Sequence, residues 1–179
     1  MPSDDADLTE APASAGDAHE AQREARRLAL GATFEADFGQ NPPARILERR
    51  IAEEGVTAEA AVLARRIVTA TARFRVEIDA QIEEIAPKYP VTQLARIDRA
   101  LLRSAMAELL HSAATPARVV IAEWVELART YSGEPARRLL NGVLGRVARE
   151  AANQGPERPA STNNNNQGGK TRRTGGSTG

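Results

Sequence analysis

Residues 97–103 read IDRALLR, residues 119–129 read VVIAEWVELAR, and residues 139–144 read LLNGVL. In each block the apolar residues recur three and four positions apart, which is the spacing that places them on one face of an α-helix. A helix with one apolar face is stable only when that face is buried against another element. The blocks therefore predict three helices that pack together. Their expected ranges are residues 93–110, 116–131 and 135–151.

Proline and glycine mark where these helices begin and end. Thr115 followed by Pro116 predicts a helix start, with a hydroxyl at the N-cap and a proline at the first helical position, where its missing N–H costs nothing. The sequence SGEP at 132–135 predicts that one helix stops and the next restarts. Gly142 lies inside the last helix, where glycine costs about 1 kcal/mol relative to alanine. We therefore expect another helix to approach Gly142 closely, and Asn141 to be a buried hydrogen-bonding partner.

Three more helices are expected in the first half of the chain. A first helix should span residues 19–38, and a short one should span residues 44–54, with Gly55 as its stop. From residue 57 to 85 apolar residues recur at steps of three and four, which predicts one long helix. The sequence contains no sustained alternation of strand-forming residues, so we predict an all-α fold.

The composition excludes several classes of protein. The chain has 179 residues and no cysteine, which excludes a disulfide framework, a thiolate nucleophile and a cysteine-based zinc site. Its apolar runs are far shorter than the ~18 residues of a membrane span, and the N-terminus lacks the pattern of a signal peptide. We expect a cytoplasmic location. Because the sequence shows no phosphate-binding, metalloprotease or hydrolase motif, we also expect a non-catalytic protein without a metal or cofactor.

The formal net charge is zero, but the charges are unevenly distributed. Residues 1–18 carry five acidic and no basic side chains, whereas residues 153–179 carry four basic and one acidic side chain. Neither segment has an apolar periodicity, so we expect both to be disordered tails around a folded domain at residues 19–152. Nearly all cations of the middle region are arginines, which suit bidentate phosphate contacts and base stacking.

The three blocks, together with the segment QREARRLALGATF at residues 22–34, resemble the NusB family of bacterial transcription antitermination factors. The resemblance spans about residues 21–147. It implies a fold of two small helical bundles packed together, with six to seven helices. It also implies a non-catalytic factor that binds boxA-type single-stranded RNA of ribosomal RNA operons together with the ribosomal protein NusE. Such a factor joins the transcription elongation complex and supports read-through by RNA polymerase.

The resemblance also suggests which residues make these contacts. In the family, RNA is bound by the arginine-rich opening of the first helix and by residues near the Asn-Gly motif. The candidate RNA contacts are Arg23, Arg26, Arg27, Phe34, Arg118, Tyr131, Arg137, Arg138 and Asn141. Asp98 and Arg99 stand in the block that meets NusE in the family, and they are the candidate partner contacts. Because arginine–phosphate contacts release counterions, RNA affinity should fall steeply with salt.

Departures from the family pattern leave a second interpretation open. Gln22 and Glu24 stand where the family often has arginine, and Leu139 stands where it usually has phenylalanine. These residues favour a helical protein-interaction module with the same fold and little RNA affinity. Some family members dimerise, so a homodimer is also an option.

Three side chains have structural explanations beside the functional ones. Asp98 suits the first turns of a helix because of the helix dipole, and it could pair locally with Arg99 or Arg103. Arg103 could instead reach back to a carboxylate such as Glu123 or Glu126. Trp124 replaces a small residue of the family pattern, so it is either buried in altered packing or exposed at an interface.

Overall fold

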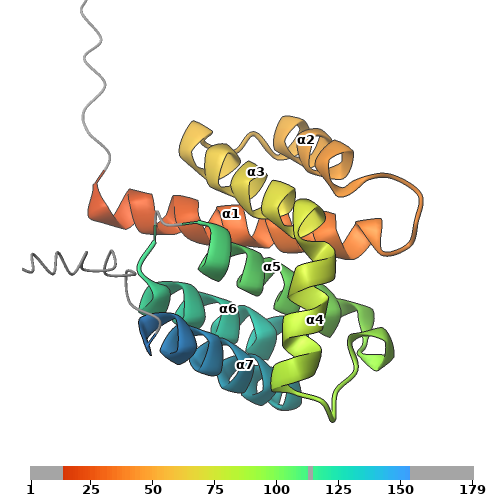
Figure 1. The fold of residues 1–179 in the computed structure, drawn as a ribbon. Helices are drawn as coiled ribbons and strands as arrows, with labels where there is room; N and C mark the ends of the chain where they lie inside the picture. Colours follow the sequence, from red (N-terminus) through yellow and green to blue (C-terminus); the bar gives the residue numbers. More distant parts are fainter. Residues whose placement is uncertain (1–13, 113–114, 154–179) are drawn as a thin grey trace, which may run out of the picture.

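The computed structural model describes residues 14–112 and 115–153. These residues form seven α-helices and one short 3-10 turn, η1, without any strand (Figure 1). The elements are α1 (Ala15–Ala36), α2 (Pro43–Glu54), α3 (Ala58–Arg73), α4 (Arg75–Ile85), η1 (Val91–Gln93), α5 (Arg96–His111), α6 (Ala117–Tyr131) and α7 (Glu134–Asn153). The expectations for residues 1–13 and 154–179 lie outside the described residues.

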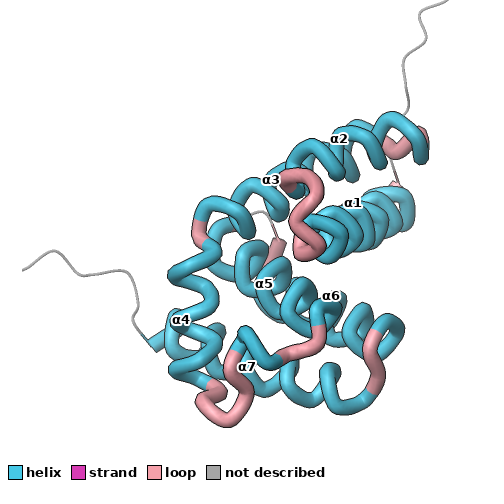
Figure 2. Tube along the Cα trace, turned by 90° about the vertical axis from the view of Figure 1, so that its right-hand side faces the viewer, coloured by secondary structure: helices cyan, strands magenta, loops and turns pink. Residues whose placement is uncertain are grey.

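The helices form two groups, and α5 contacts both of them. Helices α1, α2 and α3 pack together on one side, and α4, α6 and α7 lie on the other (Figure 2). Helix α5 packs against α1 and α3 as well as against α6 and α7, and every residue from Ala100 to Glu108 is buried. A helix that is buried all round must lie at the centre of a fold. The predicted all-α fold of two small bundles is confirmed.

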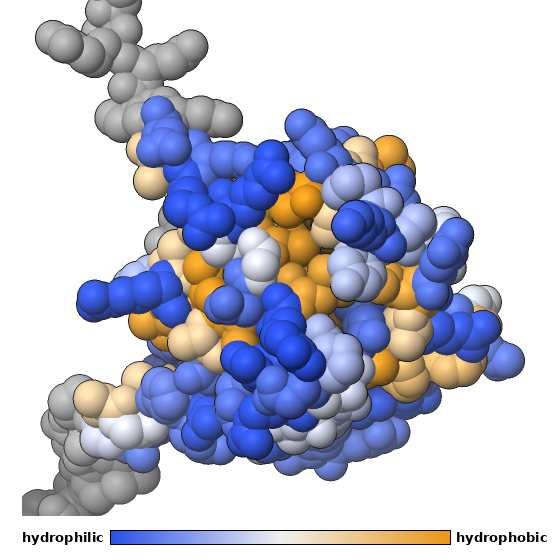
Figure 3. Space-filling model, turned by 90° about the horizontal axis from the view of Figure 1, so that it is seen from below, coloured by the Kyte–Doolittle hydropathy of each residue, from blue (hydrophilic) through white to orange (hydrophobic). Residues whose placement is uncertain are grey.

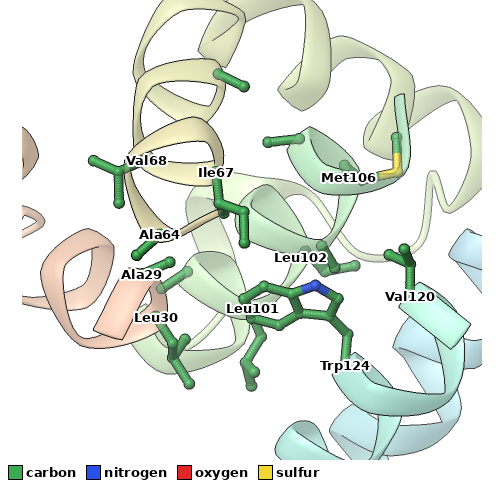
Figure 4. Packing of buried hydrophobic residues seen from close by; sticks show 14 of the residues in the cluster. Ala29, Leu30, Ala64, Ile67, Val68, Leu101, Leu102, Met106, Val120 and Trp124 are labelled. Atoms are coloured by element: carbon green, nitrogen blue, oxygen red, sulfur yellow. The ribbon is translucent and has the colours of Figure 1, made fainter. Parts of the chain in front are cut away.

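Trp124 belongs to the core rather than to an interface. Its side chain is fully buried, and Figure 4 shows the ring beside Leu101 and Leu102 of α5. Few other aromatic residues contribute to this core, because most of it consists of Leu, Ile, Val and Ala side chains. The tryptophan therefore supplies one of the largest buried apolar surfaces of the chain.

Helix α1 begins four residues earlier than the predicted start at residue 19. Ser14 and Asp17 form a reciprocal capping box: the Ser14 hydroxyl accepts from the Asp17 N–H at 3.2 Å, and the Asp17 carboxylate accepts from the Ser14 N–H at 3.0 Å. Residues 15–18 are therefore helical, and the predicted boundary of the N-terminal tail is too late for them. Asp17 stands where this motif usually has Glu or Gln.

The single long helix predicted for residues 57–85 is wrong, because Phe74 divides it into α3 and α4. The backbone of Phe74 has φ −105° and ψ 21°, outside the helical range, and its ring stacks on His111 with 3.8 Å between ring centroids. Helix α3 packs against α1, α2 and α5, whereas α4 packs against α5 and α7. The bend at Phe74 turns α4 toward α7 while both helices keep their contact with α5, so tertiary packing overrides a continuous periodicity (Figure 1).

Two predicted helix ends had different outcomes. Gly55 ends α2 in the left-handed conformation with φ 63°, as expected for a C-terminal glycine. Pro116 occupies the N-cap of α6 rather than its first helical position, and no side chain caps this helix, so the predicted role of Thr115 is wrong.

None of the described helices is long and apolar enough to cross a membrane.

Candidate nucleic-acid interface

The three arginines at the start of α1 lie on two different sides of the helix. Arg23 and Arg27 are one turn apart and exposed, so they share the surface that faces α6. The Nε of Arg23 lies 3.3 Å from a carboxylate oxygen of Glu123, whereas Arg27 has no ion-pair partner among the described residues. Arg26 points into the core. Only two of the three arginines are thus available to a ligand.

Arg26 is fully buried and forms a bidentate ion pair with Glu108 of α5, which is also fully buried. Its Nε donates to Oε2 at 3.0 Å and its Nη2 donates to Oε1 at 2.7 Å. The indole Nε1 of Trp124 donates to the same Oε2 at 2.6 Å. The prediction that Arg26 contacts RNA is therefore wrong. Its side chain satisfies a buried carboxylate, which would be very costly to leave unpaired.

Helices α1 and α6 enclose a shallow groove of about 230 Å³, which we call the α1–α6 groove. Arg23, Arg27 and Tyr131 line it, and Tyr131 is 49% exposed. Carboxylates line it as well: they belong to Glu20, Glu123 and Glu126. The groove therefore brings together three of the predicted RNA contacts, but its three carboxylates outnumber its two arginines.

Arg137 also acts on this region from the start of α7. It pairs with Glu134 at 2.9 Å, and its charge is one of those that lower the pKa of Glu126. The largest cause of that lowered pKa is the hydrogen bond from Arg129, and Arg23 contributes a further coulombic effect. Arg118 lies at the opposite end of α6, ~20 Å from Tyr131 at 1.5 Å per residue, so it does not belong to the groove.

The Asn-Gly motif of α7 lies on an open surface. Asn141 is exposed, and a Cβ added to Gly142 would meet no atom within 4 Å. The predictions of a close helix contact at Gly142 and of a buried Asn141 are therefore wrong. No neighbouring helix requires a glycine there, and Asn141 is free to meet a ligand.

A much larger groove of about 860 Å³ lies between α4, the start of α5 and α7, and we call it the α4–α7 groove. Its apolar lining includes Ile85, Leu94, Leu139 and Val143. Four basic residues, Lys88, Arg138, Arg146 and Arg149, line it as well. Figure 3, seen from below Figure 1, shows hydrophobic side chains in a hollow among hydrophilic ones. Arg138 thus lines this groove, whereas its neighbour Arg137 pairs with Glu134.

Of the two candidate partner contacts, only Asp98 lines the α4–α7 groove. Its Oδ1 is buried and has no hydrogen-bond partner among the described residues, so the expected local pairing with Arg99 or Arg103 is absent there. Arg99 instead pairs with Asp37 at the end of α1, with 2.7 Å between Nη2 and Oδ2.

Arg103 also pairs with Asp37, and it pairs with a second carboxylate in α4. Its Nη2 lies 2.8 Å from the carboxylate of Asp79 in α4, and its Nη1 lies 3.3 Å from that of Asp37. The suggestion that it reaches Glu123 or Glu126 is therefore wrong. Arg103 has a structural role, since it joins α1, α4 and α5.

Phe34 is partly buried and lies further along α1, where its ring meets that of Phe38 edge to face at 5.4 Å. Together with Arg27 and Tyr131 it lines a third groove, which also includes Phe38, Arg50 and Arg96. None of the last three was a candidate from the sequence. They come from three separate segments, and only folding brings them together.

The sequence model of the NusB family matches residues 23–149. The chain belongs to the NusB family. A relative from Chloroflexus aggregans, named transcription antitermination protein NusB, is 42% identical over 124 residues, which cover 68% of this chain and 83% of the relative.

Two solved structures share the fold of this NusB-family chain. NusB from T. maritima is 32% identical with a TM-score of 0.67, over 72% of this chain and 91% of that one. A chain from the crystal structure of antitermination factors NusB and NusE in complex with dsRNA superposes with a TM-score of 0.66 at 24% identity, over 73% of this chain and 98% of that one. At that identity the second match concerns the fold alone.

Proposed function

We propose that this chain is a transcription antitermination factor that binds boxA-type RNA at the α1–α6 groove and the ribosomal protein NusE at the α4–α7 groove. The observation that carries the proposal is the exposed pair Arg23 and Arg27. It stands on α1 within the matched family region, at the segment where family members bind RNA. The proposal includes a cytoplasmic location, because bacterial transcription takes place in the cytoplasm.

The chemistry of the α1–α6 groove suits an unpaired RNA strand. Arg27 has no described ion-pair partner, so its guanidinium can contact a phosphate without first breaking an ion pair. Tyr131 exposes a ring on which a base can stack. Phosphate contacts would also compete for Arg23, which a carboxylate now holds at 3.3 Å. Binding should therefore be sensitive to salt.

The α4–α7 groove suits a protein partner. It combines an apolar lining with basic residues and with one acceptor, Asp98 Oδ1, that lacks a hydrogen bond among the described residues. A partner that brings apolar side chains and a donor to Asp98 would satisfy both features. NusE is found with NusB in the complex that shares this fold.

A second candidate function is favoured by the carboxylates of the α1–α6 groove. Glu20, Glu123 and Glu126 offset the arginines there, which would weaken RNA binding and leave an interaction module that binds NusE alone. The deciding experiment measures binding of labelled boxA RNA, with and without NusE, at two salt concentrations. Salt-sensitive binding that tightens with NusE supports the antitermination factor. Binding to NusE without a gain in RNA affinity supports the interaction module.

A further inference from the structure

The third groove, which we call the α1–α5 groove, lies where the end of α1 meets α2, the start of α5 and the end of α6. Its volume is about 630 Å³. Three arginines and three aromatic residues line it: Arg27, Arg50, Arg96, Phe34, Phe38 and Tyr131. Arg27 and Tyr131 also line the α1–α6 groove, so the two grooves are adjacent. An extended ligand could therefore contact both grooves through Arg27 and Tyr131.

Aromatic residues are concentrated here although they are rare in the chain. The sequence has one Trp, two Tyr and three Phe, and half of these six residues line this groove. Phe38 is 52% exposed and Tyr131 is 49% exposed. The Arg96 guanidinium carbon lies 4.3 Å from the centre of the Phe38 ring. Phe38 and Arg96 thus form an exposed stack of an aromatic ring and a planar cation.

The charge of the α1–α5 groove differs from that of its neighbour. No carboxylate is among its described lining residues, whereas three line the α1–α6 groove. Arg96 has no ion-pair partner among the described residues. Arg50 pairs with Glu35 at 3.2 Å and Glu54 at 3.6 Å. The groove therefore has a net positive lining, which favours an anionic ligand.

Gly31 makes room for Arg50 in the lining of this groove. A Cβ at Gly31 would lie 3.2 Å from the guanidinium carbon of Arg50, so the absence of a side chain lets Arg50 lie directly against α1. Glycine in the middle of a helix destabilises it relative to alanine. Here it allows a third cation to reach the lining.

We propose that the α1–α5 groove binds unpaired nucleotides of the same RNA strand, with bases stacked on Phe38 and Tyr131 and phosphates in contact with Arg27 and Arg96. Exposed aromatic rings between arginines are the features that bind single-stranded nucleic acid without a sequence preference. A duplex would not use Phe38 and Tyr131 in this way, because its bases are stacked on one another. This inference rests on the proposed RNA-binding function and adds a site to it.

The test measures fluorescence anisotropy of a labelled, unstructured oligouridine titrated with the full chain. Phe38→Leu keeps an apolar side chain but removes the stacking surface, so it should lower affinity about tenfold and leave the salt dependence unchanged. Arg96→Ala should lower affinity and reduce the slope of log affinity against log salt by about one. Both side chains are exposed, so neither variant disturbs the core.

Arg75→Ala is the matched control for the change in charge. Arg75 is exposed at the start of α4, beside Phe74, whose ring stacks on His111 at the opposite end of α5 from Arg96. This control should change affinity less than about twofold, because the residue lies far from the groove.

The outcomes separate this inference from the function on which it rests. If Arg23→Ala weakens RNA binding while Phe38→Leu and Arg96→Ala match the control, the α1–α5 groove is not an RNA site and the proposed function stands. If the unmodified chain binds neither oligouridine nor boxA RNA at low salt, both this inference and the proposed RNA-binding function are contradicted. If the two groove variants weaken NusE binding and leave RNA binding intact, the groove is a protein interface and the inference is overturned.

Discussion

Trp124 and Arg26 donate hydrogen bonds to the same oxygen of Glu108, at 2.6 and 3.0 Å, inside the core. The three residues come from α6, α1 and α5, so one carboxylate joins three helices. This arrangement is costly to dismantle because each remaining partner would be left buried and unsatisfied.

Removal of the carboxylate should destabilise the fold strongly. Glu108→Ala leaves the Arg26 charge buried without a partner, so we expect a loss of about 3–5 kcal/mol in the free energy of unfolding. Trp124→Phe removes only one donor and part of the ring, and should cost about 1–3 kcal/mol. Urea denaturation measures both values. Arg65→Ala, which breaks the exposed pair with Glu48, should have a far smaller effect. Equal losses in Arg65→Ala and Glu108→Ala would contradict this explanation.

Stability should decrease slightly with mild acid because of His111. His111 is exposed overall, but its ring stacks on Phe74, and partial desolvation is the main cause that lowers its pKa below the ordinary value of 6.5. The unfolded chain therefore binds a proton more readily than the folded chain. The contribution of neutral His111 to the free energy of unfolding is complete above pH 6.5. It decreases as the pH falls from 6.5 through the lower pKa of the folded state.

The check compares the original chain with His111→Phe, which keeps a ring to stack on Phe74 but does not titrate. Thermal unfolding at pH 7.5 and at pH 5.5 should show a larger decrease in the original chain than in the variant. An identical decrease would assign the acid sensitivity to other groups.

Two glycines should respond oppositely to alanine. Gly142 is helical with nothing within 4 Å of an added Cβ, so Gly142→Ala should raise the free energy of unfolding by about 1 kcal/mol and Tm by about 2–4 °C. Gly31→Ala gains the same helix propensity, but its Cβ displaces Arg50. It should show little or no gain by calorimetry. A rise of equal size in both variants would show that Arg50 moves aside freely.

Asp98 should matter for partner binding and little for folding. Its Oδ1 has no described hydrogen-bond partner in the isolated chain, so Asp98→Ala should leave thermal stability nearly unchanged. If a donor of NusE satisfies this oxygen, the variant should bind NusE at least about tenfold more weakly in calorimetric titrations. Glu59→Ala, on exposed α3 surface of the other bundle, is the control and should bind normally. Unaltered NusE affinity in Asp98→Ala would place the partner elsewhere.

Helix identity could be predicted from the sequence because apolar spacing reports which residues share a face. The break at Phe74 could not, since the apolar stripe continues through it and the bend accompanies a change in tertiary contacts, from α1 for α3 to α7 for α4. The start of α1 could have been found from Ser14 and Asp17, because a capping box is a local signal.

The candidate interface was less predictable for a related reason. Arg26 resembles Arg23 and Arg27 in sequence, and only the position of Glu108, 82 residues away, shows that it is buried. Arg137 and Arg138 are adjacent, yet only Arg138 lines the α4–α7 groove, because successive helical residues point about 100° apart. Phe38 and Arg96 meet through the tertiary fold alone.

Helix α5 supplies buried side chains to both bundles along an unbroken run from Ala100 to Glu108. A cut on either side of α5 removes this helix from one bundle and exposes the face of α5 that the bundle covered, so we expect fragments containing one bundle to be much less stable than the whole chain. The two halves should also melt in a single cooperative transition. The two helices should also differ in how many substitutions they tolerate. Helix α2 buries only Ile46 and Leu47, so most of its positions should accept other residues. Almost any substitution in the middle of α5 should affect both bundles at once.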